Sequence, residues 1–210
     1  MIRILIADDH EVVRRGLKDI LAEEFDKLRI GEATRANEIL DAVRKQEWDV
    51  VLLDINLPGR SGLDVLEELR RLFPRLPVVV LSAFPEADYA LRAFKLGAAG
   101  YVTKQSASDE LLVALRKALA GGKYVTTSLA EKLAANLAGE VTSEPHESLS
   151  NRELQVLRMI AGGKTIKEIA ADLFLSEKTV GTYRTRLSEK MGLGTNVELT
   201  RYALQHRLVD

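Results

Sequence analysis

The sequence predicts an α/β domain built on a doubly wound, five-stranded parallel sheet, followed by a small all-α domain of four helices. Aliphatic runs alternate five times with helical patterns over residues 1–123. The runs lack polar alternation, which is typical of parallel strands that helices cover on both faces. From residue 149 onward the patterns are short and helical, and residues 149–210 carry a net charge of +3, against −1 for 1–123 and −3 for 124–148. These shifts predict domains at 1–123 and 149–210, joined by a linker at 124–148.

The strand–helix units of the first domain follow one another without interruption. Apolar residues at helical spacing, such as Val13, Leu17 and Leu21, mark the first helix. Pro74 ends the third helix, and Gly97 ends the fourth. The predicted strands cover residues 2–8, 28–32, 48–54, 76–83 and 99–104, and the predicted helices cover 11–24, 36–46, 62–73, 86–97 and 108–122.

The linker and the second domain show a different pattern. Residues 124–138 favour one further helix, and residues 139–148 are polar and acidic. Helices are expected within 150–163, 165–174, 176–192 and 196–208, the first of them with Ser150 and Glu153 at the spacing of a capping box. A tight turn at Leu175 and Ser176 joins the second helix to the third, which predicts a helix-turn-helix motif at about residues 166–185.

Several polar residues stand where the predicted strands end. "VVLLDINLPG" (50–59) is an aliphatic run that ends in Asp54, and the others are Asp8, Asp9, Ser82 and Lys104. Parallel strands bring their carboxyl ends to one edge of the sheet, where ligands bind in such folds. Carboxylates there suit Mg²⁺, and a carboxylate can act as a nucleophile toward phosphorus.

Each of these residues also has a simpler interpretation when it is taken alone. Asp8 and Asp9 fit a solvated turn or a helix cap, Asp54 fits a turn before Pro58, and Lys104 fits an ordinary strand end. Their joint placement on four strands favours a site over these separate explanations.

Residues 2–123 resemble the receiver domain of two-component response regulators, which has a flavodoxin/CheY-like fold. The motifs that carry the resemblance are "IADDH", "VVLLDINLPGRSGLDVL", "VVVLSAF" and "GAAGYVTK". The resemblance implies that a sensor histidine kinase phosphorylates Asp54 and that Lys104 contacts the phosphoryl oxygens. It also implies a Mg²⁺ site made by Asp8, Asp9, Asp54 and the backbone carbonyl of Asn56. Ser82 and Tyr101 correspond to the family's switch pair. Gln105 stands where many receivers have proline.

Residues 149–207 resemble the LuxR-type helix-turn-helix domain of NarL/FixJ-type regulators. The resemblance rests on "LSNRELQVLRMIAGGKTIKEIAADLFLSEKTVGTYRTRLSEKMG". In helix 177–191, Val180, Leu187 and Met191 form one apolar stripe that we expect in the core. The other face is a solvated surface on the simpler interpretation and a DNA-reading surface on the one we favour. The expected DNA-binding residues are Lys178, Thr179, Thr182, Tyr183, Thr185 and Arg186. Gly181 stands where relatives frequently carry a polar side chain.

We therefore expect a transcription regulator rather than an enzyme. Phosphorylation of Asp54 would control dimerisation and sequence-specific DNA binding, so the expected partners are DNA, the kinase, a second copy of the chain and RNA polymerase. One alternative is a Mg²⁺-dependent phosphatase, which would need an acid where Asn56 stands. The other is a DNA-binding regulator whose pocket is vestigial.

Composition points to the cytoplasm as the location. Cysteine is absent, hydrophobic residues make up 46% of the chain, and no apolar stretch is as long as a membrane span. We see no signal peptide at the start of the chain.

One further feature, the closing helix, is open at this stage. The closing helix has two apolar stripes, one with Val197, Leu204 and Leu208 and the other with Leu199, Tyr202 and Ala203. Either both are partly buried, or the second stripe is a dimer contact on DNA.

His10, His146 and His206 are far apart in the sequence without ligand spacing, so we expect no histidine metal site. "AGGKT" (161–165) lacks the first glycine of a phosphate-binding loop and fits a helix end instead.

Overall fold

The structure is a computed structural model that describes residues 1–210 apart from 84–85, 107, 138–143, 207 and 210. The chain divides into two compact units, residues 1–138 and residues 139–210. Each unit is described by itself below. The proposed boundaries at 123 and 149 stay predictions, because unit 1 also contains the helix α6 (Thr127–Leu137).

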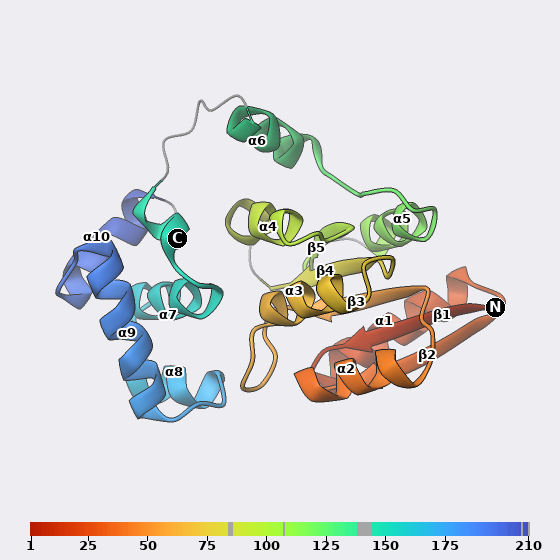
Figure 1. The fold of residues 1–210 in the computed structure, drawn as a ribbon, viewed down its shortest axis with the longest axis horizontal. Coiled ribbons are helices and arrows are strands. Elements are labelled where there is room, and N and C mark those ends of the chain that lie inside the picture. The colour runs from red at the N-terminus through yellow and green to blue at the C-terminus, as the bar shows by residue number, and fades with distance from the viewer. Residues whose placement is uncertain (84–85, 107, 138–143, 207, 210) are drawn as a thin grey trace. The chain divides into compact units, whose positions relative to one another are not determined.

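Unit 1 contains the expected five-stranded parallel sheet (Figure 1). Its strands are β1 (Ile2–Ala7), β2 (Leu28–Ala33), β3 (Val50–Asp54), β4 (Val78–Ser82) and β5 (Gly100–Thr103). Their order is β2-β1-β3-β4-β5, and every neighbouring pair is parallel. The order reverses between β1 and β3, so the carboxyl ends of these two strands flank the switch point at which doubly wound sheets bind ligands.

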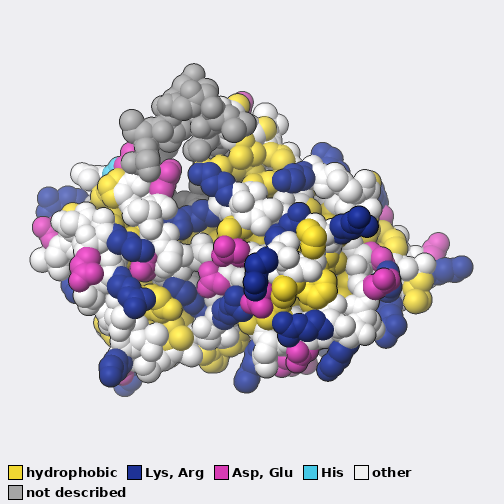
Figure 2. Space-filling view, viewed as in Figure 1, with side chains coloured by type: hydrophobic (Ala, Val, Ile, Leu, Met, Phe, Trp, Pro, Cys, Tyr) yellow, Lys and Arg dark blue, Asp and Glu magenta, His cyan; other side chains and the backbone are white. Residues whose placement is uncertain are grey.

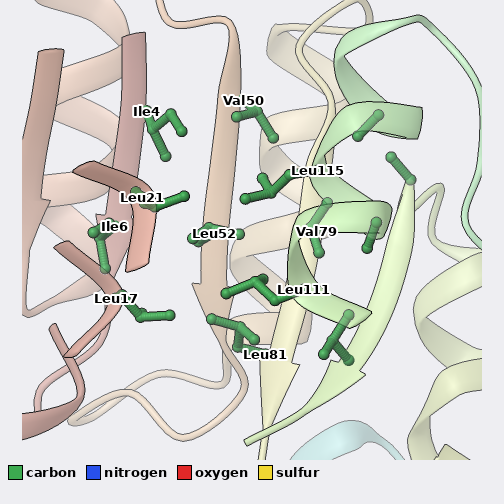
Figure 3. Packing of buried hydrophobic residues seen from close by; sticks show 14 residues of the cluster. Ile4, Ile6, Leu17, Leu21, Val50, Leu52, Val79, Leu81, Leu111 and Leu115 are labelled. Atoms are coloured by element: carbon green, nitrogen blue, oxygen red, sulfur yellow. The ribbon is translucent and has the colours of Figure 1, made fainter. Parts of the chain in front are cut away.

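Helices cover both faces of this sheet. They are α1 (Glu11–Glu24), α2 (Ala36–Lys45), α3 (Gly62–Leu72), α4 (Glu86–Lys95) and α5 (Ser108–Leu119). Alternate strand residues such as Ile4, Leu52 and Val79 pack against Leu21 of α1 and Leu115 of α5 (Figure 3). The residues between them in the strands, for example Leu5 and Val51, are buried as well, so both faces of the sheet are covered. This double burial is the reason for the continuous aliphatic runs in the sequence.

β3, β4 and β5 begin one or two residues later than the sequence predicts, while β1 and β2 begin where expected. Trp48 and Asp49 lie directly before β3, and their side chains contact β2 and β1. Asp49 receives hydrogen bonds from the amide and the guanidinium of Arg3. The Trp48 ring lies against Gly31 of β2, where a Cβ atom would come 2.2 Å from a ring carbon. The sheet therefore needs a glycine at position 31.

Unit 2 is helical, as expected. Its described residues form a short 3-10 helix η1 (Pro145–Ser148), which the sequence did not predict, and four α-helices. These are α7 (Asn151–Ala161), α8 (Ile166–Asp172), α9 (Glu177–Met191) and α10 (Asn196–Gln205). α7 packs against α8, α9 and α10, and the core includes Leu157, Val180, Leu187 and Leu199.

Local sequence signals explain where these helices begin. Ser150 and Glu153 form the expected capping box at the start of α7, and Thr165 and Glu168 form another at the start of α8. Phe174 has a φ of 54° in the turn between α8 and α9. A hydrogen bond from the Leu175 amide to the Ala170 carbonyl closes that turn. The helix-turn-helix connection therefore lies where the sequence placed it.

On the face shown in Figure 2, basic, acidic and hydrophobic side chains are interspersed over the surface of unit 1. This mixture agrees with the nearly balanced charge of residues 1–123. Of the helices in the described part of the chain, none combines the length and the apolar character that spanning a membrane requires.

Candidate functional site

The carboxyl edge of the sheet gathers the polar residues that the sequence singled out. Asp54 is the last residue of β3, Ser82 is the last of β4, and Asp8 and Lys104 directly follow β1 and β5. The parallel register aligns Ala7 with Leu53, Asp54 with Leu81, and Ser82 with Thr103. Segments that are distant in the sequence thus end side by side.

Lys104 is the centre of this cluster. Its Nζ atom lies 2.6 Å from Asp54 Oδ2 and 2.6 Å from Asp8 Oδ2. Both carboxylates are buried, and 16% of the Lys104 side chain is exposed. A buried carboxylate is costly without a counter-charge, so the ammonium group is what makes two neighbouring acids tolerable here.

Asp54 lies at the edge of the sheet, as expected, but only 1% of it is exposed. The loop that follows folds back tightly over it. A Cβ atom at Gly62 would come 1.9 Å from the Asp54 carbonyl oxygen, so only glycine fits there. The Gly62 amide donates to the Ile55 carbonyl, and Ser61 caps α3. The Asn56 amide donates to Asp54 Oδ1 at 3.1 Å, while Lys104 contacts Oδ2, so each carboxylate oxygen has a partner.

Two residues join the cluster that the sequence analysis did not assign to it. The Nδ1 atom of His10 lies 2.9 Å from Asp9 Oδ1 and 3.2 Å from Asp8 Oδ1. The guanidinium of Arg14 donates to the Asp8 carbonyl at 3.0 Å. The sequence could have assigned His10 to the cluster, because His10 directly follows Asp8 and Asp9. It could not have assigned Arg14, because the position of Arg14 depends on how α1 is oriented after β1, and residue spacing does not show that orientation.

The surroundings shift the acid–base properties of Asp54. Burial raises the pKa of its carboxyl group to about 6, and the Asp8 charge adds to the rise, while Lys104 opposes it. Burial on its own would lower the pKa of Lys104, but the charges of Asp54 and Asp8 and their hydrogen bonds outweigh this, and the pKa is raised. Lys104 therefore stays a cation, and Asp54 takes up a proton at a higher pH than an ordinary aspartate does.

The donor set fits a divalent cation. Asp8, Asp9, His10 and Asp54 each offer a ligand atom, and these atoms lie within 4.8 Å of one another. Among the described residues, Lys104 Nζ lies 2.6 Å from Asp8 Oδ2 and His10 Nδ1 lies 2.9 Å from Asp9 Oδ1, and both oxygens are buried. Carboxylate oxygens are the ligands of hard cations such as Mg²⁺.

Ser82 and Tyr101 are both buried, at 0% and 2% exposure. The Lys104 amide donates to the Ser82 carbonyl at 2.7 Å, which ties the end of β4 to the residue that pairs with Asp54. The structure thus places the expected switch residues on the two strands next to the acidic cluster. Their role stays a prediction.

The second candidate surface is the outer face of α9. Ser176 caps this helix by accepting the Thr179 amide, and the two hydroxyl groups lie 2.8 Å apart. The hydroxyls of Thr182 and Thr185 donate to the backbone carbonyls of Lys178 and Gly181. Of the expected DNA-binding residues, Lys178, Thr182, Thr185 and Arg186 are exposed, while Thr179 and Tyr183 are half-buried.

Gly181 lies on the same helix, and a Cβ atom there would meet no atom within 4 Å. Packing therefore does not require a glycine at this position. Glycine inside a helix costs about 1 kcal/mol relative to alanine, so it weakens α9 at the centre of this face.

The structure rules out one of the two interpretations of α10. Leu199 and Ala203 of the second stripe are fully buried in unit 2, so they cannot form a dimer contact. Val197 and Leu204 of the first stripe are 69% and 51% exposed. α7 packs against α10, and the first stripe is only partly uncovered, because Leu208 is buried as well.

Comparison with known families gives two matches, one in each unit. A family described as "Response regulator receiver domain" matches residues 4–116. A family described as "Bacterial regulatory proteins, luxR family" matches residues 147–203. The first match covers the acidic cluster, and the second covers α9.

Several relatives are similar over their whole length. The response regulator GacA of Pseudomonas viridiflava is 37% identical over 211 residues, which span 100% of this chain and 99% of the relative. The response regulator UvrY of Escherichia coli K12 is 35% identical over 211 residues, which span 100% of this chain and 97% of the relative.

Solved structures are also similar to the chain over nearly its whole length. RcsB from Salmonella enterica serovar Typhimurium, bound to promoter rprA in the presence of phosphomimetic BeF3−, has a TM-score of 0.64 at 28% identity. This match spans 96% of the present chain and 97% of that one. An RcsB–DNA complex has a TM-score of 0.58 at 26% identity, with 97% and 98% coverage.

Proposed function

The chain belongs to the two-component response regulators that carry a LuxR-type DNA-binding domain, and we propose that Asp54 is its phosphoacceptor. Members of this family are DNA-binding transcription regulators and not enzymes, which removes the phosphatase alternative. Asn56 also stands where a phosphatase of that kind would need an acid. The domain boundaries that we propose are 1–123, 124–148 and 149–210.

One observation carries the assignment of Asp54. Its buried carboxylate contacts Lys104, and Asp8 and Asp9 lie around the same point. A carboxylate that served only the fold would not need two further acids beside it. A nucleophile that must receive a dianionic phosphoryl group needs cationic charge placed beforehand, and Lys104 supplies it.

The proposed reaction is an in-line transfer from a phosphohistidine of the sensor kinase. An oxygen of Asp54 bonds to phosphorus, the phosphorus–nitrogen bond breaks, and the histidine nitrogen leaves with the electron pair. The product is an aspartyl phosphate, and its oxygens replace the Asp54 carboxylate as the partners of Lys104.

The receiver family implies a divalent cation in the acidic cluster, and we propose Mg²⁺. Asp8, Asp9, Asp54 and the backbone carbonyl of Asn56 would hold it. When bound, the ion neutralises charge on the transferred phosphoryl group. The chain's own residues do the rest: the loop after β3 orients Asp54, and burial excludes water from it.

We propose that Ser82 and Tyr101 transmit the change. The hydroxyl of Ser82 would move toward the phosphoryl group, and the Tyr101 ring would follow behind it. The face made by α4, β5 and α5 would shift, because Tyr101 belongs to β5. This shift would control how one copy of the chain meets another.

For DNA recognition we propose that α9 enters the major groove. Lys178 would contact phosphates and Arg186 base edges, since these are the long cationic side chains among the expected contacts. Val197 and Leu204 of α10 would pair two copies on a two-fold related site. The proposed partners are DNA, the sensor kinase, a second copy and RNA polymerase, and the proposed location is the cytoplasm, where the DNA is.

Affinity for a selected DNA site tests this proposal. The site is obtained by selection from genomic fragments, and binding is measured with and without acetyl phosphate and Mg²⁺. We expect the phosphodonor to increase the affinity of the wild type and to leave Asp54→Asn unchanged. If the donor changes neither protein, the pocket is vestigial and phosphorylation does not control binding.

Arg186→Ala tests the base contact. It should lose more affinity for the selected site than for random DNA, by the roughly 1–3 kcal/mol that a base contact contributes. Lys178→Ala is the control and should weaken both to a similar extent. Equal losses in Arg186→Ala would mean that Arg186 contacts only phosphates.

A further inference from the structure

A cluster of two histidines, a glutamate and a tyrosine lies in unit 2, where η1 meets the end of α10. Glu144 precedes η1, His146 belongs to it, Tyr202 lies in the last turn of α10, and His206 follows that helix. The His146 and His206 rings are 5.8 Å apart. The separation of the histidines along the chain led us to expect no histidine metal site, but the fold brings His146 and His206 together, while His10 lies in unit 1.

Local structure holds both sides of the cluster in place. Pro145 stands at the start of η1, the Glu147 amide donates to the Glu144 carbonyl, and Leu149 is buried just beyond. On the other side, the His206 amide donates to the Tyr202 carbonyl and ends α10. The ligand-bearing backbone positions are therefore fixed by hydrogen bonds and not only by the side chains.

The separations suit a metal ion. His206 Nδ1 lies 3.5 Å from Glu144 Oε2. In a tetrahedral zinc site with bonds of about 2.1 Å, two ligand atoms lie about 3.4 Å apart. Glu144, His146 and His206 each have a ligand atom within 4.8 Å of the other two, so closure around an ion needs movement of side chains and not of the backbone.

Tyr202 orients both histidines. Its Oη atom shares a hydrogen bond of 2.9 Å with His146 Nδ1, which leaves Nε2 of that ring for a ligand. Its ring stacks on the His206 ring with centroids 4.1 Å apart. Metal-binding histidines usually have the second nitrogen engaged in this way, because the bond fixes the tautomer and the ring orientation.

We propose that Glu144, His146 and His206 form a binding site for a divalent transition-metal ion, with Zn²⁺ as the best match. Imidazole nitrogens favour such ions over Mg²⁺, and two histidines with one glutamate are a known zinc donor set. The Glu144 and His206 side chains are 36% and 30% exposed, so the ion can enter and water can fill the fourth position. Bound metal would fasten residues 144–148 to α10, the helix with exposed Val197 and Leu204.

Calorimetry on the full chain tests the site. The protein carries no histidine tag, is stripped of metal with a chelator, and is titrated with Zn²⁺ while excess Mg²⁺ occupies the acidic cluster. We expect one Zn²⁺ per chain. His146→Gln and His206→Gln should each lower the affinity by more than about 100-fold, and Tyr202→Phe by roughly 10-fold, since outer-shell partners contribute 10–100-fold.

Asp9→Asn is the matched control, because it alters the acidic cluster and leaves unit 2 intact, so its Zn²⁺ affinity should equal that of the wild type. Circular dichroism checks that each variant is folded, and Glu144→Gln replaces any histidine variant that is not. The proposal is overturned if the histidine variants bind Zn²⁺ like the wild type, or if Asp9→Asn abolishes the binding.

Discussion

Lys104 Nζ lies 2.6 Å from Asp54 Oδ2, although 50 residues separate the two positions in the chain. The contact exists because β3 and β5 both end at the same edge of a parallel sheet, on either side of β4. Burial disfavours the charged form of Asp54, and the ammonium group favours it. The balance between these two effects gives the following two predictions.

Replacement of Lys104 should raise the pKa of Asp54 further. Lys104 is the largest influence that lowers this pKa, so Lys104→Gln should move it above the wild-type value of about 6. Carbon-13 NMR of the Asp54 carboxyl group in Mg²⁺-free buffer measures it directly. Lys18→Gln is the control, because Lys18 pairs with the exposed Glu32 elsewhere in unit 1. An unchanged pKa in Lys104→Gln would show that the ion pair does not persist in solution.

Asp54 should also make the stability of unit 1 depend on pH. Its folded pKa of about 6 lies above the ordinary value of 3.8, so the folded state binds more protons between these values. Stability should therefore fall as the pH rises from about 4 to 6. Asp54→Asn removes this loss and should stabilise unit 1 at pH 8 by on the order of 1–3 kcal/mol, with little gain at pH 4.

Urea unfolding followed by the fluorescence of Trp48 measures this effect, since the chain has one tryptophan and it lies in unit 1. The buffers contain no Mg²⁺. A variant that is less stable than the wild type at pH 8 would contradict the account.

In unit 2, the side chain of Glu153 should stabilise the packing of α7 against α9. It is 4% exposed and accepts hydrogen bonds from Lys190 at 2.6 Å and from the Ser150 amide at 2.7 Å. Burial alone would raise its pKa, but these bonds outweigh burial and hold the pKa below its usual range. The stabilisation should thus be present above about pH 4.3 and be lost as the pH falls through the lowered value.

Glu153→Gln should destabilise unit 2 by about 1–3 kcal/mol at pH 7, the range for hydrogen bonds to charged groups. Hydrogen exchange of the α7 and α9 amides in the full chain provides the measurement. Glu168→Gln has the same capping role on exposed surface and should have a smaller effect. Similar effects from both variants would assign the role to capping and not to the Lys190 contact.

The exposed apolar residues of α10 should contribute to association and not to folding. The double substitution Val197→Ser and Leu204→Ser should leave thermal stability unchanged and weaken the dimer on DNA by about tenfold or more. Leu199→Ala, on the buried stripe, should instead destabilise unit 2 by about 2–5 kcal/mol. Sedimentation of the protein with a selected DNA site measures the dimer, and an unaffected double variant would exclude this surface.

Periodicity and composition carried the prediction of the fold. The runs around Val51 and Val79 show no alternation because these strands are buried on both faces, and this regularity determined the parallel sheet. The acidic cluster followed from the same regularity, since Asp8, Asp54 and Lys104 each stand at a strand end.

Contacts between irregular segments could not be predicted in this way. Glu144 and His206 meet because η1 packs near the end of α10. Neither segment has a repeating sequence pattern from which its neighbour in the fold could be predicted. Likewise, both stripes of α10 have helical spacing, and only the position of α7 decides that Leu199 is buried while Leu204 is exposed.

The central claim is that Asp54 is the phosphoacceptor, and mapping the phosphoryl group tests it most directly. The full chain is incubated with acetyl phosphate and Mg²⁺, the acyl phosphate is trapped by borohydride reduction, and mass spectrometry of peptides locates the modified residue. We expect a single modified aspartate, Asp54, and no label in Asp54→Asn. Undiminished labelling of Asp54→Asn, or a label on another residue in the wild type, would contradict the assignment.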